Sequence, residues 1–173
     1  MKNIALGLVT LLCAACTSYG GSGLLPGVAT LAEVEAAMGA PALRWPEPDG
    51  GQSLAFPRGP AGFHTYVARF RGDGRLIGLR NVLEPSTFAL VRAGMTQEEV
   101  LHLLGPPFPG WTTYFEQRDE LVWEWRFCDD WGEAARFNVL FSGTTGQVRT
   151  TMALTERQSM PFGSGNRRSW CSR

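Results

Sequence analysis

The chain has 173 residues, and 44% of them are hydrophobic, which is enough for a core of ordinary domain size. Its 16 lysine and arginine residues balance 16 aspartate and glutamate residues, so the formal net charge is zero. This balance argues against nucleic acid as a partner and against electrostatic binding to an anionic bilayer.

Residues 1–15 have the pattern of an export signal. Lys2 supplies a positive charge, residues 4–12 are apolar or small, and Ala14 and Ala15 precede Cys16. The apolar stretch is too short for a resident transmembrane helix. The segment resembles the lipobox of bacterial lipoproteins, in which the signal is removed and the new N-terminal cysteine, here Cys16, carries acyl chains such as palmitate. An ordinary secretory signal is the alternative interpretation.

The lipobox resemblance implies attachment to a membrane through lipid. Since Thr17 stands where an aspartate would retain such a protein at the inner membrane, it implies the outer membrane, with the protein facing the periplasm. Residues 16–27 are rich in glycine and serine, which predicts a flexible linker after the lipidated cysteine.

An internal repeat predicts the same short helix twice. Thr30 and Glu33, like Thr96 and Glu99, have the spacing of a capping box, and a glycine ends each helix. The two copies align without a gap as Thr30-x-x-Glu33-Val34-x-x-x-Met38-Gly39-x-Pro41-x-x-x-Trp45 and Thr96-x-x-Glu99-Val100-x-x-x-Leu104-Gly105-x-Pro107-x-x-x-Trp111.

After each helix the sequence alternates between apolar and polar residues, which predicts four strands per copy and a tight turn before the last. We therefore expect an α+β fold of two tandem units, 28–83 and 84–156, each a short helix or helices packed on an antiparallel meander, followed by a tail over 157–173. The expected strands are Leu43–Trp45, Gln52–Phe56, His64–Arg71 and Arg75–Leu83, then Trp111–Gln117, Leu121–Cys128, Ala134–Ser142 and Gln147–Leu154.

The second unit resembles the SmpA/OmlA (BamE-like) family of small outer-membrane lipoproteins, and tandem copies of the unit resemble the architecture of secreted β-lactamase inhibitor proteins. The first resemblance implies a non-enzymatic accessory of the β-barrel assembly machinery. It rests on the pattern Phe88-x-x-Val91-x-x-Gly94-Met95-Thr96-x-x-Glu99-Val100-x-x-x-Leu104-Gly105-x-Pro107. The first unit repeats this pattern weakly, because residues 24–30 lack a convincing first helix.

Cysteine usage points to an oxidising compartment. If Cys16 carries lipid, Cys128 and Cys171 are the two remaining thiols of the mature chain. In an oxidising periplasm such a pair favours a disulfide, which would hold the C-terminal tail near the strand that ends at Cys128.

Aromatic residues of the second unit form the candidate partner-binding set: Trp111, Tyr114, Trp123 and Trp125. An open aromatic sheet face would suit protein binding, because tryptophan, tyrosine and arginine dominate interface hot spots. The simpler alternative is that Trp123 and Trp125 face the core beneath the helices.

No pattern in the chain indicates catalysis, a metal site or a cofactor. The histidines, His64 and His102, are far apart in the sequence, and the acidic pairs at 119–120 and 129–130 fall in predicted turns. We therefore expect a non-enzymatic protein-binding or outer-membrane assembly module without a small-molecule substrate. The alternative is an inhibitor-like module that binds a periplasmic or cell-wall enzyme.

Overall fold

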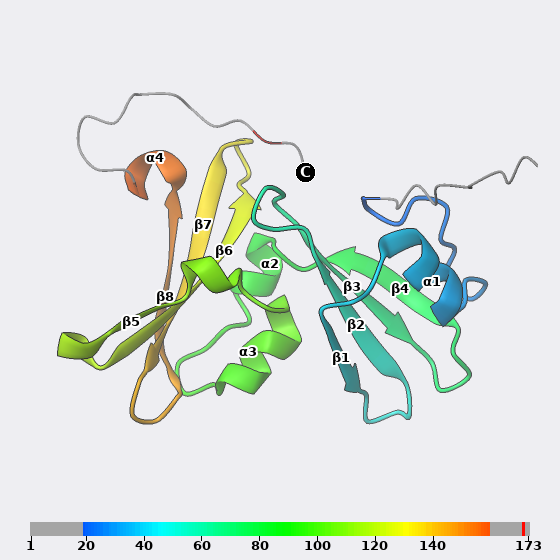
Figure 1. Cartoon of the computed structure of the whole chain (residues 1–173), viewed down its shortest axis with the longest axis horizontal. Helices are drawn as coiled ribbons and strands as arrows, with labels where there is room; N and C mark the ends of the chain where they lie inside the picture. Colours follow the sequence, from blue (N-terminus) through cyan, green and yellow to red (C-terminus); the bar gives the residue numbers. More distant parts are fainter. Residues whose placement is uncertain (1–18, 160–170, 172–173) are drawn as a thin grey trace, which may run out of the picture.

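The computed structural model describes residues 19–159 and residue 171. It contains two four-stranded antiparallel sheets with strand orders β1-β2-β3-β4 and β5-β6-β7-β8, each with short helices, as the sequence predicts (Figure 1). The first unit comprises α1 (Leu31–Met38), β1 (Leu43–Pro46), β2 (Gln52–Pro57), β3 (Thr65–Phe70) and β4 (Leu76–Asn81). The second comprises α2 (Pro85–Phe88), α3 (Gln97–Leu104), η1 (Pro109–Trp111), β5 (Thr113–Phe115), η2 (Glu116–Arg118), β6 (Glu120–Cys128), β7 (Ala134–Ser142), β8 (Val148–Thr155) and α4 (Glu156–Ser159).

The two units repeat each other in detail at the start of the helix. Both predicted capping boxes form: the threonine hydroxyl accepts from the backbone amide of the third helical residue, and the glutamate there accepts from the threonine amide. The residue before each cap also pairs with the last strand, since Leu76 N donates to Ala29 O and Val148 N donates to Met95 O, both at 2.8 Å. Each unit therefore joins its helix to its fourth strand in the same way.

Alternation along the strands fills a separate core in each unit. The core of the first unit lies between α1 and one face of its sheet: Ala29, Val34, Met38, Leu54, Phe56, Ala68, Phe70 and Leu76. The core of the second lies between its sheet and α2 and α3: Val82, Leu83, Phe88, Val91, Val100, Leu104, Trp123, Trp125, Phe127, Ala135, Phe137, Val139, Phe141 and Val148.

The units stack because α3 also touches the first sheet. In Figure 1, α2 and α3 lie between the two sheets, and α1 covers the far side of the first sheet. Val67 of β3 packs against the second core, and a Cβ at Gly105 would lie 2.7 Å from Thr65 Cγ2. The glycine that ends α3 therefore permits close approach of the two units.

The segment expected as a flexible linker, residues 16–27, is described from residue 19 onward. Its described part, residues 19–27, packs on the first unit: Gly21 is buried, Leu24 contacts the first core, and Gly27 N donates to Leu76 O at 2.7 Å. Gly21, Gly23 and Gly27 have positive φ, a conformation that glycine adopts readily. The expected signal, Cys16 and most of the C-terminal tail lie outside the described residues.

Candidate functional site

The structure separates the four aromatic residues of the predicted partner-binding set. Trp123 and Trp125 lie in the second core, with 9% and 2% of their surface exposed, and Trp125 Nε1 donates to the backbone oxygen of Gly105 at 3.2 Å. Tyr114 is 51% exposed on β5. Trp111, at the end of η1, is partly exposed. Only Trp111 and Tyr114 are therefore available at the surface.

The second sheet has an outer face that points away from α2 and α3. Register and alternation define it, because Trp123, Trp125 and Phe127 point to the core and their neighbours point the opposite way. We call it the outer face; its residues are Thr113, Phe115, Glu120, Val122, Glu124, Arg126, Arg136, Asn138, Leu140, Thr150, Met152 and Leu154.

A charged network occupies the end of the outer face that lies next to α4. Glu156 of α4 accepts from Arg126 Nε at 2.6 Å and from Arg126 Nη2 at 2.8 Å, and it lies 3.4 Å from Arg136 Nη2. Arg136 also pairs with Glu124 on the neighbouring strand. Because these side chains are mostly shielded from water and paired in two directions, the guanidinium groups are held in fixed orientations.

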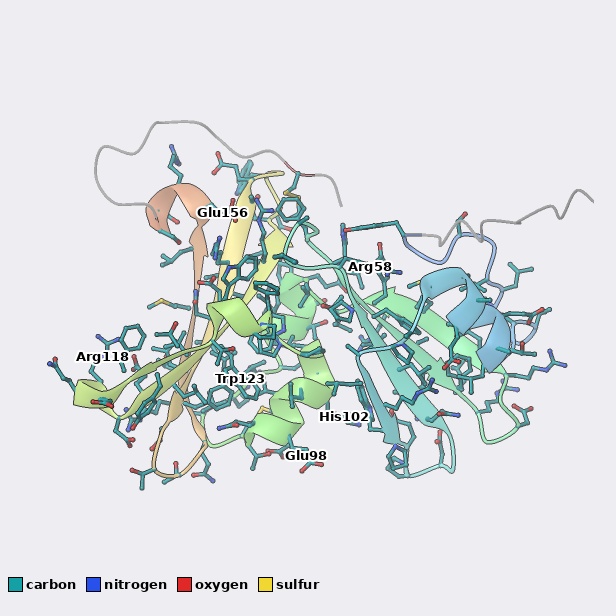
Figure 2. All side chains as sticks on the ribbon, viewed as in Figure 1. Arg58, Glu98, His102, Arg118, Trp123 and Glu156 are labelled. Carbon is teal, nitrogen blue, oxygen red and sulfur yellow. A yellow bond between two sulfur atoms is a disulfide. The ribbon has the colours of Figure 1, made fainter. Side chains whose placement is uncertain are left out.

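Aromatic rings stack on the arginine side chains at this surface. The ring of Trp111 lies 4.4 Å from Arg136 Cζ, and the ring of Phe115 lies 4.4 Å from Arg118 Cζ. Figure 2 shows Arg118 projecting from the far end of the β5 hairpin and Glu156 at the opposite end of the sheet. Aromatic rings therefore contact arginine side chains at both ends of the outer face.

The exposed Tyr114 is fixed by a hydrogen-bonded cluster around Asp119. Tyr114 Oη donates to Asp119 Oδ1 at 2.9 Å, and Thr144 donates to Asp119 Oδ2 through its amide at 3.0 Å and its hydroxyl at 2.8 Å. The Thr144 and Tyr114 hydrogen bonds keep the pKa of the Asp119 carboxyl below its ordinary value. The bond to the Asp119 carboxylate raises the pKa of Tyr114. Both groups therefore hold their charge states across neutral pH.

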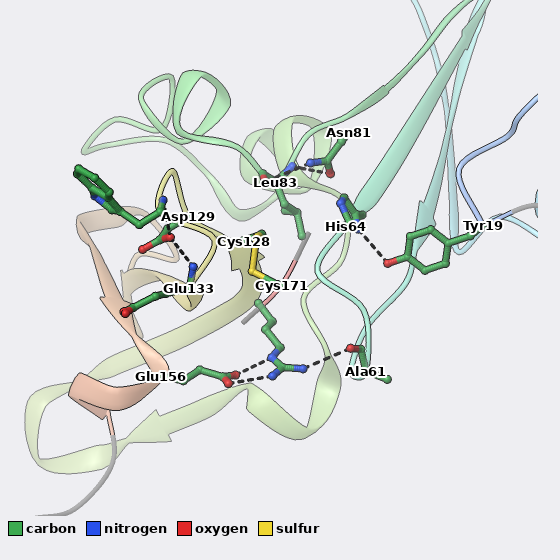
Figure 3. The surroundings of a disulfide bond; sticks show 12 residues. Tyr19, Ala61, His64, Asn81, Leu83, Cys128, Asp129, Glu133, Glu156 and Cys171 are labelled. Carbon is green, nitrogen blue, oxygen red and sulfur yellow. Dashed lines mark hydrogen bonds and ion pairs between the residues drawn. A yellow bond between two sulfur atoms is a disulfide. The ribbon is translucent and has the colours of Figure 1, made fainter. Parts of the chain in front are cut away.

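The expected disulfide joins Cys128 at the end of β6 to Cys171, with their Cα atoms 5.7 Å apart (Figure 3). Cys171 N also donates to Gly132 O at 2.9 Å. The tail is therefore attached to the β6–β7 turn, as the cysteine pattern predicts. The nearby Asp129 carboxylate accepts from the amides of Trp131 and Glu133, an arrangement typical of a turn.

The two histidines occupy different environments. His64 is 9% exposed beside Tyr19 and Tyr66, and burial lowers its pKa. His102 stacks on Trp45 with 4.7 Å between ring centroids. No group of three or more His, Cys, Asp or Glu within residues 19–159 and 171 is placed to hold a metal ion. The same part of the chain contains no helix that is long and apolar enough to span a bilayer.

Sequence reasoning found two of the outer-face groups and missed several others. The alternation that places Glu124 and Arg126 on a solvated face also places Phe115, Arg136 and Met152 there, once the strand pairing is known. Glu156 follows the last predicted strand, and no local pattern indicates that it pairs with Arg126.

Comparison with known proteins yields no relative of this chain. No protein-family model, no curated protein and no solved structure matches it.

Proposed function

We propose that this protein is a non-enzymatic lipoprotein of the outer membrane, facing the periplasm, that binds another envelope protein through the outer face of its second sheet. The observation that carries the proposal is the composition and rigidity of that face. Within the described residues, α2 and α3 both pack on the opposite side. Trp111 of η1, Glu156 of α4 and Phe63 of the β2–β3 loop contact the arginines of the outer face.

The outer face has the chemistry of a protein interface. Phe115 and Met152 are 40% and 45% exposed, and they lie on the same face as the paired Arg126 and Arg136. Interfaces are enriched in aromatic residues, methionine and arginine, and depleted in lysine. Side chains that are already held in place lose less conformational entropy on binding than mobile ones.

The resemblance of the second unit to small outer-membrane lipoproteins makes the β-barrel assembly machinery the first candidate partner. The location rests on the lipobox resemblance around Cys16 and on a disulfide of the kind that forms outside the cytoplasm. Anchoring by acyl chains on Cys16 would keep the outer face near integral proteins of the same membrane.

Co-purification from the native envelope tests the proposal. The full-length protein is recovered in mild detergent after brief crosslinking, in parallel with Met152→Glu and Leu25→Glu variants. Both positions are exposed, at 45% and 61%, but Leu25 lies in the 19–27 segment that packs on the first unit and serves as the matched control. We expect the same envelope protein to accompany wild type and Leu25→Glu and to be lost from Met152→Glu.

Equal recovery of that protein with all three chains would reject the outer face as the binding surface. The identity of the recovered protein separates the two functions. Components of the barrel assembly machinery support an assembly role, and a soluble enzyme supports the inhibitor-like alternative.

A further inference from the structure

The N-terminal end of the described chain is fixed against the loop that joins β2 and β3. Tyr19 Oη and His64 Nδ1 share a hydrogen bond of 2.9 Å (Figure 3), and Arg58 Nε donates to Tyr19 O at 2.9 Å. A Cβ at Gly62 would lie 2.6 Å from Tyr19 Oη, so the tyrosine rests directly on this loop. The place where the chain joins the folded domain is therefore set by three separate contacts.

The same loop forms one wall of an apolar hollow at the junction of the two units. The hollow has a volume of about 240 Å³ and opens to solvent; Gly62 and His64 belong to its lining. The remaining walls consist mainly of prolines and aromatic rings: Pro57, Pro106, Pro107, Phe108, Trp111 and Trp125. Tyr19 thus touches two residues that line the hollow.

The ionisable groups of the hollow, Arg126 and His64, are already engaged. The Arg126 guanidinium, which lines it, pairs with Glu156 and donates to Ala61 O at 3.3 Å (Figure 3). His64 is bonded to Tyr19. Since burial also keeps the pKa of His64 below its ordinary value, its ring is neutral at physiological pH. The lining therefore favours an uncharged, apolar occupant.

We propose that this hollow receives one acyl chain carried by Cys16, an inference that rests on the proposed lipidation. Thr17 and Ser18 are the only residues between Cys16 and Tyr19. Three residues of extended chain span at most about 11 Å, so acyl chains on Cys16 start within about that distance of Tyr19, whose hydroxyl touches the lining of the hollow. The hollow, with a volume of about 240 Å³, has room for part of one slender chain.

Occupation of the hollow would bring the folded domain close to the lipid surface. Because two residues separate Cys16 from Tyr19, the end of the molecule that carries Tyr19 and the β2–β3 loop would face the bilayer. Asp130 of the β6–β7 turn and Phe63 of this loop line a common cavity, so both units contribute to that end. The lipid would thereby orient the domain as well as anchor it.

Photo-crosslinking with a diazirine derivative of palmitate tests the hollow itself. The probe is added to purified chain from residue 16 onward with Cys16→Ser, which retains every described residue, and adducts are mapped by mass spectrometry. We expect adducts within residues 57–64 and 105–111 that unlabelled palmitate removes by competition.

Two substitutions and one control sharpen the result. Ala42→Phe and Pro109→Glu alter exposed positions that line the hollow, one by filling it and one by adding a charge. The control, Ala36→Phe, introduces the same phenylalanine side chain at an exposed position of α1. For each hollow variant whose circular dichroism spectrum matches that of the wild type, we expect the amount of labelling to fall at least fivefold. Ala36→Phe should be labelled as strongly as the wild type. Labelling elsewhere, or labelling that neither hollow variant reduces, would overturn the proposal.

The lipidated protein distinguishes this inference from the proposed anchor. Cells are supplied with the same photoreactive palmitate, and the purified full-length protein is irradiated. We expect a crosslink within one molecule between the Cys16 peptide and the peptides that line the hollow. If the measured mass of the purified protein included no lipid, the proposed anchor would be rejected. If the protein were lipidated but formed no such crosslink, the hollow would be rejected as the site of the acyl chain.

Discussion

Substitution of Gly105 by alanine should weaken the packing between the two units, and Gly39→Ala provides a matched control. Both glycines end the repeated helix, with φ and ψ of 70° and −175° at Gly105 and 87° and −171° at Gly39. A residue with a side chain pays about 1–3 kcal/mol in this region, so both variants lose roughly that amount of stability.

The two sites differ in what the added methyl group meets. At Gly39 nothing lies within 4 Å, but at Gly105 the new Cβ would stand 2.7 Å from Thr65 Cγ2 and 3.4 Å from Ala55 Cβ. Thr65 and Ala55 are buried in the first sheet. Overpacking of a filled site costs about 1–3 kcal/mol, which we expect as an additional loss for Gly105→Ala alone.

Urea unfolding followed by circular dichroism measures both losses as changes in the free energy of unfolding. Thr65→Ser deletes the Cγ2 methyl, so the Gly105→Ala/Thr65→Ser double variant should lose less stability than the sum of the single variants, by about 1 kcal/mol. Equal losses for Gly105→Ala and Gly39→Ala, or additive losses in the double variant, would refute the close approach of α3 to the first sheet.

Four further predictions concern local features of the fold. Thr30→Ala and Thr96→Ala should each lower the free energy of unfolding by about 1 kcal/mol in the same urea assay, because each removes a helix cap; an unchanged midpoint for both would contradict the capping role. Reduction of the disulfide should lower the free energy of unfolding by about 4 kcal/mol by the chain-entropy estimate for a loop of 43 residues; unfolding curves that coincide with and without reductant would count against it. Burial lowers the pKa of His64 from 6.5, so the unfolded chain binds a proton that the folded chain does not, and the free energy of unfolding should fall as the pH drops below about 6.5. His64→Gln should remove this pH-dependent loss of stability. The same pH profile for the wild type and His64→Gln would be inconsistent with the prediction. The hydrogen bonds from Thr30 and Thr96 lower the pKa of Glu33 and Glu99 from 4.5. The stability that these carboxylates contribute should therefore be present above about pH 4.5 and be lost as the pH falls through their folded-state pKa. In Glu33→Gln and Glu99→Gln, the free energy of unfolding should depend less on pH in this acidic range.

Helices α1 and α3 and most strands could be predicted from the sequence because their signals are local. Thr30 with Glu33, and Thr96 with Glu99, each specify a helix start within four residues. The turn at 73–74 and the alternation of Trp123, Trp125 and Phe127 likewise depend on neighbouring residues. The pairing of Cys128 with Cys171 follows from counting the cysteines left in an exported chain, and the structure contains that bond.

Features that depend on distant contacts could not be predicted. The expected strand at Trp111–Gln117 is reduced to β5 at Thr113–Phe115, between two short 3₁₀ helices. Proline and glycine before the strand form the first of these helices, and the second leads into the Asp119 cluster. The glycine-rich segment before Thr30 looks like a linker, yet it packs on the first unit through bonds to His64 and Leu76. Glu156 pairs with Arg126 across 30 residues, and no sequence pattern reveals that contact.

Site-specific photo-crosslinking in living cells tests most directly whether the outer face binds a protein. A photoreactive amino acid is placed at Met152 on the outer face and, in a second chain, at Leu25 in the segment that packs on the first unit. Both positions are exposed, and the binding proposal predicts a discrete protein adduct from position 152 that position 25 does not form. Identical adducts from both positions, or no adduct from position 152, would contradict it.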